Sequence, residues 1–326
     1  MSSARTTVAR ALLNAERLLI GVHPRADGDA LGSMVALAMG LRGLGKEVRM
    51  YSPDGVSPMY SFLALAAEVQ AQVGGEDVQW ADAVLLLDCD GASRTGALEQ
   101  WLRHSKVLLD VDHHEKERAF GDVRWVDPKR AAVAEMVYEL LGEMGITVTP
   151  EMATALLAGI YVDTGSLRYS NTRPQTYRLC AELARLGARA EEVSAHLYEV
   201  RSYAALRILG EALRSAQLDW CGSIIWSALP REVFEVCGAS PDDMEGVIDL
   251  LRGHRDSQVA LLAYERPDGM VKVSLRSKNS VDVAEVAREW GGGGHTRAAG
   301  FERRVPLQQV VEETLARLRA CLGGPA

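Results

Sequence analysis

Eight side chains that commonly bind metal ions stand at four places in the chain. They are His23, Asp27, Asp29, Asp88, Asp112, His113, His114 and Asp163. Carboxylates with a minority of imidazoles suit Mn²⁺, Mg²⁺ or similar hard divalent cations, and no CxxC pair accompanies them to form a thiolate zinc site. Several aspartates packed together without cations would repel one another strongly. The set therefore predicts a centre for divalent metal ions.

Three of the four places directly follow apolar runs that are typical of buried strands. LLIGV (18–22) precedes His23, AVLLL (83–87) precedes Asp88, and KVLLDV (106–111) precedes the triplet 112–114. Taken alone, an Asp-Gly-Asp is most often a turn, and an isolated His pair lies mostly on the surface. Ligands of open parallel sheets, however, bind beyond the carboxyl ends of the strands. We therefore expect these side chains to converge.

The order of apolar runs and breakers predicts an α/β protein with two domains. A strand, loop and helix at 18–45 are followed by strands at 47–52, 83–88 and 106–112, which indicates a parallel sheet. Helices are expected at 131–145, 150–163 and 174–187, and further helical residues extend over 188–215. Strands at 223–229, 258–265 and 271–277 with two helices predict a second, smaller α/β domain. We expect the first domain to comprise residues 1–190, a helical connection to cover 191–215, and the second domain to comprise 216–326.

Composition narrows the class of protein and of substrate. The 326 residues carry a net charge of −8, so the chain lacks the overall basic character of a protein that tracks along extended nucleic acid. Short or small anionic substrates are expected. Five scattered cysteines indicate a reducing cytoplasm, and no apolar run approaches the roughly 20 residues needed to span a bilayer. The oligomeric state stays open, a homodimer included.

Four segments together resemble the motifs of the DHH phosphoesterase superfamily. They are HPRADGDALGS (23–33), VLLLDCDGASRTG (84–96), the triplet 112–114, and GIYVDTGSLRYSNT (159–172). The later GGGGHTRAAG (291–300) resembles the glycine-rich motif of the DHHA1 domain. In length and layout the chain is most similar to the NrnA-type oligoribonucleases. The resemblance implies a parallel-sheet N-terminal DHH domain and a smaller α/β C-terminal DHHA1 domain, with the active-site cleft between them.

The resemblance also implies a role for each ligand residue. His23 and Asp27 would hold one metal ion, and Asp29, His113 and Asp163 the other. Asp88 would bridge the two. Asp112 would fix the ring of a neighbouring histidine, and His114 would face the substrate phosphate, which makes Asp88, Asp112 and His114 the catalytic set. Two ions, most readily Mn²⁺ with Mg²⁺ as an alternative, can activate water and clamp the attacking and leaving oxygens.

Candidate substrate contacts lie mainly in the last quarter of the chain. The glycines of the motif 291–300 would allow backbone N–H groups to approach a phosphate closely, and the basic residues His295 and Arg297 follow them. Arg276 and Lys278 fall on one side of a predicted strand, although an exposed polar face explains that pattern equally well. Arg94 is either a phosphate contact or a surface arginine. The predicted substrate contacts are Arg94, Arg276, Lys278, Gly293, Gly294, His295 and Arg297.

The preferred function is hydrolysis of short oligoribonucleotides to mononucleotides, with conversion of adenosine 3′,5′-bisphosphate to AMP as a second activity. A phosphodiesterase for cyclic di-AMP or linear dinucleotides would use the same ligands. A family II pyrophosphatase would share the early motifs but not GGGGH. A RecJ-like single-strand exonuclease is less favoured because only 6% of the residues are aromatic. The alternative without catalysis is a nucleotide-sensing module.

Overall fold

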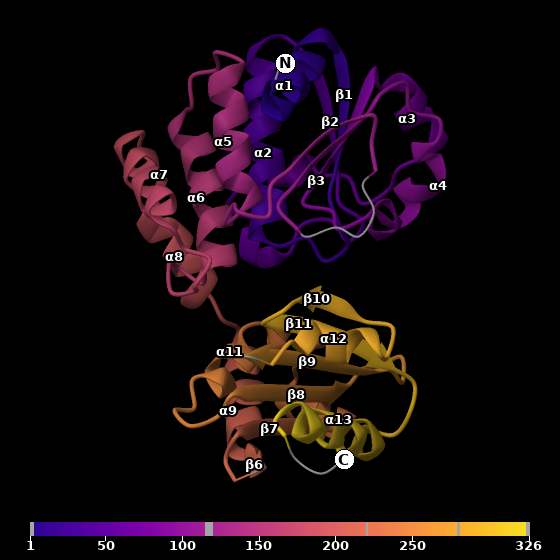
Figure 1. Ribbon diagram of the computed structural model, residues 1–326, viewed down its shortest axis with the longest axis vertical. Coiled ribbons are helices and arrows are strands. Elements are labelled where there is room, and N and C mark those ends of the chain that lie inside the picture. Colours follow the sequence, from indigo (N-terminus) through magenta and orange to yellow (C-terminus); the bar gives the residue numbers. More distant parts are fainter. Residues whose placement is uncertain (1–2, 115–119, 220, 279–280, 324–326) are drawn as a thin grey trace. The chain divides into compact units, whose positions relative to one another are not determined.

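The computed structural model describes residues 3–114, 120–219, 221–278 and 281–323, and the chain divides into two compact units, 1–200 and 201–326 (Figure 1). The strands of the first unit are β1 (Arg17–Gly21), β2 (Glu47–Tyr51), β3 (Ala83–Leu87), β4 (Leu108–Asp112) and β5 (Val123–Val126). Its α-helices are α1 (Ala4–Asn14), α2 (Gly28–Gly43), α3 (Gly75–Trp80), α4 (Glu99–Leu102), α5 (Val133–Glu143), α6 (Pro150–Thr164), α7 (Pro174–Arg185) and α8 (Ala190–Tyr198).

The sheet of the first unit has the strand order β2-β1-β3-β4-β5, and all its pairs are parallel. Helices α1, α2, α5 and α6 pack on one face, while α3 and α4 cover the other (Figure 1). Burial on both faces explains why β3 reads as an unbroken apolar run. The chain order reverses between β1 and β3, and crevices at such points are where α/β sheets bind ligands.

Helices α2 and α6 pack unusually closely because glycines lie between them. A Cβ atom on Gly32 would stand 2.2 Å from the carbonyl oxygen of Ala155, and one on Gly159 would stand 2.7 Å from Oδ1 of Asp29. Both distances are far below van der Waals contact. The small-residue pattern of α2 therefore brings the first turn of that helix, which carries Asp29, against α6.

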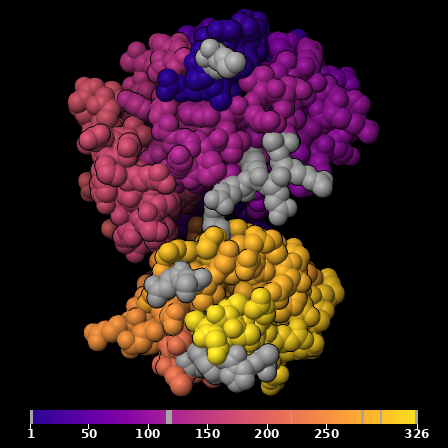
Figure 2. Space-filling model, in the orientation of Figure 1, coloured from indigo at the N-terminus to yellow at the C-terminus, as the bar shows by residue number. Residues whose placement is uncertain are grey.

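The second unit contains a six-stranded mixed sheet in the order β10-β11-β9-β8-β7-β6. Only β7 and β8 pair in parallel among its described strands. Helices α12 and α13 share one apolar core with the sheet, and α9, α10 and α11 share another on the opposite face; α13 reaches the surface in Figure 2 (yellow). The elements are α9 (Tyr203–Arg214), β6 (Gln217–Asp219), β7 (Ile224–Leu229), α10 (Arg231–Cys237), α11 (Val247–Arg252), β8 (Val259–Glu265), β9 (Val271–Ser277), α12 (Val283–Arg288), β10 (Gly293–His295), β11 (Ala298–Arg303) and α13 (Leu307–Cys321).

The structure confirms the α/β class and the parallel sheet, and it adds elements that the sequence pattern did not predict. These are β5, β6, β10, β11, α3, α4, α10 and α13. The helical stretch expected at 191–215 consists of two helices, of which α8 packs in the first unit and α9 in the second. Within the described part of the chain, no helix is both long and apolar enough to cross a membrane.

Candidate metal centre

The first group of ligands lies where β1 ends and α2 begins. Nδ1 of His23 lies 2.9 Å from the carbonyl oxygen of Pro24, so Nδ1 carries the proton and Nε2 is left as the ligand atom, 3.6 Å from Oδ2 of Asp88. Asp27 is the N-cap of α2, and its Oδ1 accepts hydrogen bonds from the N–H groups of Asp29 and Ala30. The cap holds the Asp27 carboxylate at the start of the helix.

The second group joins α2, the end of β4 and the end of α6. Nε2 of His113 lies 3.1 Å from Oδ2 of Asp163. Asp29 is fully buried, and its two oxygens accept the backbone N–H groups of Val133, at 2.5 Å, and Ala134, at 2.8 Å, which open α5. The helix N-terminus favours this negative charge. Asp29 is thereby held in one orientation at the centre.

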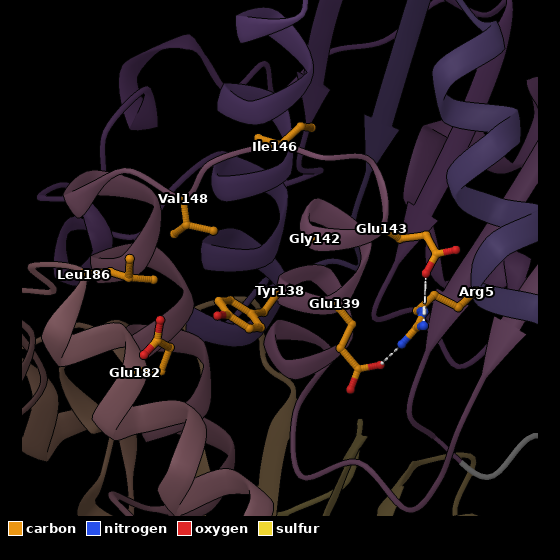
Figure 3. A pocket seen from close by; sticks show the side chains of 9 residues that line it. All are labelled: Arg5, Tyr138, Glu139, Gly142, Glu143, Ile146, Val148, Glu182 and Leu186. Atoms are coloured by element: carbon orange, nitrogen blue, oxygen red, sulfur yellow. Dashed lines mark hydrogen bonds and ion pairs between the residues drawn. The ribbon is translucent and has the colours of Figure 1, made fainter.

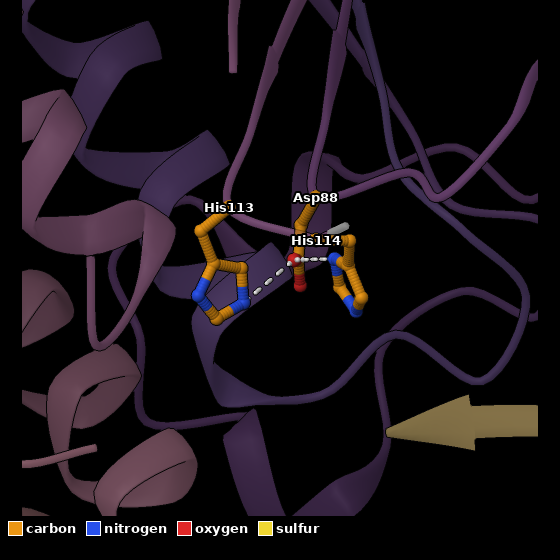
Figure 4. Close-up of side chains that lie close together, drawn as sticks. All are labelled: Asp88, His113 and His114. Carbon is orange, nitrogen blue, oxygen red and sulfur yellow. Dashed lines mark ion pairs between the residues drawn. The ribbon is translucent and has the colours of Figure 1, made fainter. Parts of the chain in front are cut away.

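Asp88 stands between the two groups, directly after β3. Its Oδ1 lies 3.6 Å from Nε2 of His113 and 3.4 Å from Nδ1 of His114, and the two rings flank the carboxylate (Figure 4). Oδ1 is buried and has no hydrogen-bond partner among the described residues. The φ angle of Asp88 is 57°, a left-handed conformation that is uncommon for non-glycine residues and that clusters at functional sites.

The donor set fits divalent cations. Ligand atoms within 4.8 Å of one another form the groups His23–Asp27–Asp88, Asp29–His113–Asp163 and Asp88–His113–His114. A buried carboxylate oxygen without a hydrogen-bond donor is what a cation would satisfy. In the third group Nδ1 of His114 already lies 2.8 Å from Oδ1 of Asp112, so the first two groups are the better metal sites. Asp88 adjoins both of them.

Asp112 supports the histidines from behind. It is fully buried, and its Oδ1 accepts the backbone N–H groups of His113, at 2.7 Å, and His114, at 3.2 Å, as well as facing Nδ1 of His114. Nδ1 of His113 turns instead to the carbonyl oxygen of Arg130, at 3.2 Å. The Nε2 atom of each ring is consequently directed away from its support.

The crowded carboxylates and imidazoles shift one another's pKa values in the metal-free protein. Burial lowers the pKa of His23, but Asp88, Asp27 and the carbonyl group of Pro24 together raise it to about 9. Burial, with Asp163 and Asp88, raises the pKa of Asp27 to about 7 and also raises that of Asp29. Burial opposes ionisation of Asp88, yet the three histidines hold its pKa low. Protons thus occupy sites that cations would otherwise fill.

The predicted substrate residues lie elsewhere in the chain. Arg94 ends a short 3₁₀ helix (Ala92–Arg94) and is exposed. Nε of Arg276, on β9, lies 3.4 Å from Oδ1 of Asp249 on α11. Lys278 donates to the carbonyl oxygen of His254.

The guanidinium of Arg297 donates to the carbonyl oxygen of Lys278. The side chains of Lys278 and Arg297 therefore also brace loops of their own unit. His295 ends β10, but its side chain lies outside the described residues. Of the two basic residues in the glycine motif, only Arg297 can therefore be placed by its contacts.

The glycine motif forms a hairpin and not the flexible loop that was its alternative. Gly293 pairs with Gly300, and Gly294 pairs with Ala299. A Cβ atom on Gly294 would lie 2.4 Å from the carbonyl oxygen of Ala298, so close approach of the two strands already requires glycine there.

The hairpin continues onto β9, where Gly300 faces Ser274 and Ala298 faces Arg276. Alternate β9 residues, including Ser274 and Arg276, are part-exposed, while the residues between them are buried. A patch of small residues therefore borders Arg276.

Sequence reasoning missed the groups that hold the ligands. The segment 130–134 and Asn171 carry no metal-binding side chain, and their contribution is made through backbone atoms and an amide. The only available signal for Asn171 was its place in the segment 159–172 that already contained Asp163.

A pocket of about 410 Å³ lies away from this centre, between α1, α5 and α7 (Figure 3). Arg5 in its wall pairs with Glu139 and Glu143, and Glu182 adds a third carboxylate. None of the metal-ligand candidates lines it. Its acidic wall would repel a phosphate, which argues against substrate binding there.

A parallel sheet with carboxylates and imidazoles gathered at its carboxyl edge defines a metal-binding α/β protein. Residues 17–160 match the DHH family, N-terminal domain, and residues 233–324 match the DHHA1 domain. The bifunctional oligoribonuclease and PAP phosphatase NrnA of Thermus thermophilus is 31% identical over 93% of this chain and 89% of its own length. The chain belongs to the DHH/DHHA1 phosphoesterase family.

Solved structures agree with this fold. An exopolyphosphatase-related protein from Bacteroides fragilis superimposes with a TM-score of 0.92 at 22% identity, over 98% of this chain and 97% of that one. RecJ from Thermus thermophilus in complex with Mn²⁺ superimposes with a TM-score of 0.60 at 18% identity, over 99% of this chain and 55% of that one. At these identities the likeness concerns the fold.

Proposed function

We propose that the protein hydrolyses short oligoribonucleotides to mononucleotides and converts adenosine 3′,5′-bisphosphate to AMP. The observation that carries the proposal is the position of Asp88, which adjoins a group with His23 and Asp27 and lies 3.6 Å from the His113 of a second group. One carboxylate shared by two ligand groups suits a phosphoesterase with two metal ions. The relative from Thermus thermophilus bears both activities in its name.

His23, Asp27 and Asp88 would hold one ion, and Asp29, His113, Asp163 and Asp88 the other. Mn²⁺ is the preferred cation, since the donors are hard and the similar RecJ structure contains Mn²⁺. Bound there, two cations would supply a water of lowered pKa and stabilise charge on the phosphate.

The remaining residues orient the reaction and move a proton. Water attacks phosphorus, the bond from phosphorus to the leaving oxygen breaks, and that oxygen needs a proton. Burial lowers the pKa of His114, but Asp112 and Asp88 outweigh it and raise the pKa above its usual value. The raised pKa favours the protonated ring, and His114 would donate this proton from Nε2. Asp112 holds the ring for this transfer.

The second unit would hold the nucleotide. Arg276 stands on a sheet face bordered by Ala298 and Gly300, which leave room for a phosphate or a sugar beside the guanidinium. Arg94, Lys278, Gly293, Gly294, His295 and Arg297 complete the proposed substrate contacts. We place the protein in the cytoplasm, in line with its five free cysteines.

The test is a comparison of substrates with manganese-loaded protein. RNAs of two to five nucleotides, adenosine 3′,5′-bisphosphate, cyclic di-AMP, pyrophosphate and single-stranded DNA are assayed in parallel, with Asp88→Ala as the control. The expected result is mononucleotide release from the RNAs, AMP from the bisphosphate, and loss of both in the variant. Preferential cleavage of another substrate, or full activity of Asp88→Ala, contradicts the proposal.

A further inference from the structure

One short segment holds two of the three ligands in the second metal group. The carbonyl oxygen of Arg130 faces Nδ1 of His113, and the N–H groups of Val133 and Ala134 donate to the two oxygens of Asp29. The segment 130–134 therefore fixes the ring of one ligand and the carboxylate of another. Any shift of this segment moves both ligands together.

Asn171 connects that segment to the third ligand. Its Nδ2 donates to the carbonyl oxygen of Ala131, at 3.2 Å, and to that of Asp163, at 3.0 Å. Only the NH₂ end of an amide can serve two carbonyl groups, so these partners determine which way the side chain is turned. Its Oδ1 is buried and accepts no hydrogen bond from the described residues. A buried oxygen without a donor costs free energy, so the two hydrogen bonds of Nδ2 must offset that cost.

A second connection fixes Ala131 from its other side. The buried Glu135 accepts the N–H of Ala131 at 3.2 Å through Oε2, and its Oε1 accepts the hydroxyl of Thr176 at 2.6 Å. The peptide groups of Ala131 are thus held at N–H by Glu135 and at C=O by Asn171. Both contacts lead to the stretch 171–176 that follows Asp163.

Among the described residues, the first metal group is held by other contacts. His23 is oriented by the carbonyl oxygen of Pro24, and Asp27 by the N–H groups at the start of α2. Neither contact involves Asn171 or the segment 130–134. Loss of the Asn171 amide should therefore affect the two groups unequally.

We propose that Asn171 is a positioning residue for the group Asp29–His113–Asp163 and sets the affinity of one metal ion without binding it. This inference rests on the two-ion centre of the proposed function. Partners that orient metal ligands commonly change metal affinity by about 10- to 100-fold when removed. The expected effect of Asn171→Ala is a weakening of that size at one site only.

The test is a titration of the metal-free full chain with Mn²⁺, followed by calorimetry and by electron paramagnetic resonance. The wild type should bind two ions and show the signal of a spin-coupled pair. Asn171→Ala should bind one ion as the wild type does and the second about 10- to 100-fold more weakly, with an uncoupled signal at low Mn²⁺. Ser170→Ala, an exposed neighbour, is the matched control and should behave as the wild type.

Unchanged binding of both ions by Asn171→Ala, or equal weakening of both, overturns the proposal. A second variant, Asn171→Ser, guards against misfolding, because its hydroxyl can still donate to one carbonyl group. It should give an intermediate loss, and circular dichroism shows whether each variant is folded. Excess Mn²⁺ should restore kcat in both variants, because the weakened site fills at a high concentration of the ion. Failure of the wild type to cleave RNA would refute the proposed function without altering this titration.

Discussion

Oδ1 of Asp112 lies 2.8 Å from Nδ1 of His114, and the same oxygen accepts the backbone N–H of His114. The contact assigns the proton of the neutral ring to Nδ1 and directs Nε2 away from the support. A buried carboxylate in this position raises the pKa of His114, although burial alone lowers it. Ring orientation and proton affinity thus depend on one side chain.

Removing the charge of Asp112 should impair the proton transfer more than metal binding. Asp112→Asn keeps an acceptor oxygen but lowers the pKa of His114, so the protonated acid is lost at a lower pH. We expect kcat to fall about 10- to 100-fold and the alkaline limb of the pH–rate profile to move to lower pH. Metal content and steady-state rates from pH 6 to 10 measure this. An alkaline limb at the wild-type pH would contradict the role of Asp112.

Substitution of His114 should separate catalysis from metal loading. His114→Asn removes the proposed proton donor while the ligand groups with His23 and His113 remain, so kcat should fall about 10²- to 10⁴-fold. Bound manganese should stay at the wild-type level. His104→Asn changes an exposed histidine and is the control. Loss of an ion in His114→Asn would show that the ring is itself a ligand.

Binding of Mn²⁺ should tighten as pH rises. Burial lowers the pKa of His23, but Asp88 with Asp27 and the carbonyl group of Pro24 raises it to about 9 in the metal-free protein. Its proton must leave before Nε2 can bind a cation. Affinity should therefore increase about tenfold per pH unit well below pH 9 and level off around that pH. Below pH 7 protonated Asp27 makes the dependence steeper. Calorimetry in buffers of different ionisation enthalpy counts the released protons, and an affinity independent of pH between 7 and 8.5 would contradict this reading.

A methyl group on Gly159 should damage both packing and the second metal group. Its Cβ would stand 2.7 Å from Oδ1 of Asp29 and 2.9 Å from Cβ of Ala134. We expect Gly159→Ala to lower the free energy of unfolding by about 1–3 kcal/mol and to weaken one Mn²⁺ site. Gly142→Ala, in α5, meets no atom within 4 Å and should be neutral or slightly stabilising. Urea unfolding and manganese titration of both variants decide the matter.

Arg276 should act on substrate binding alone. Arg276→Ala removes a proposed phosphate contact in the second unit, where none of the metal-ligand candidates lies. KM for dinucleotides should therefore rise about tenfold or more. Manganese stoichiometry should not change. Arg288→Ala, an exposed arginine of α12, is the control for loss of positive charge. A change confined to kcat would place Arg276 outside the substrate contacts.

Much of the centre could be predicted because its ligands are distinctive side chains at strand ends. Asp88 follows an apolar run, and a parallel sheet brings the carboxyl ends of its strands to one edge. The glycine hairpin was harder to predict from the sequence. Its glycines serve close contact between β10 and β11, and sequence pattern does not distinguish that need from flexibility.

By itself, the sequence determined the α/β class, the parallel type of the first domain's sheet and the kinds of side chain that bind metal. These depend on the local hydrophobic pattern and on side-chain chemistry. Only the tertiary structure decided what holds those ligands. Backbone N–H and C=O groups are the same in every residue, so no pattern could indicate that Val133 would face Asp29. Nor could spacing show that Asn171 joins Asp163 to Ala131, which lies 40 residues before Asn171. Such contacts arise from packing between distant segments, and packing is a property of the folded chain.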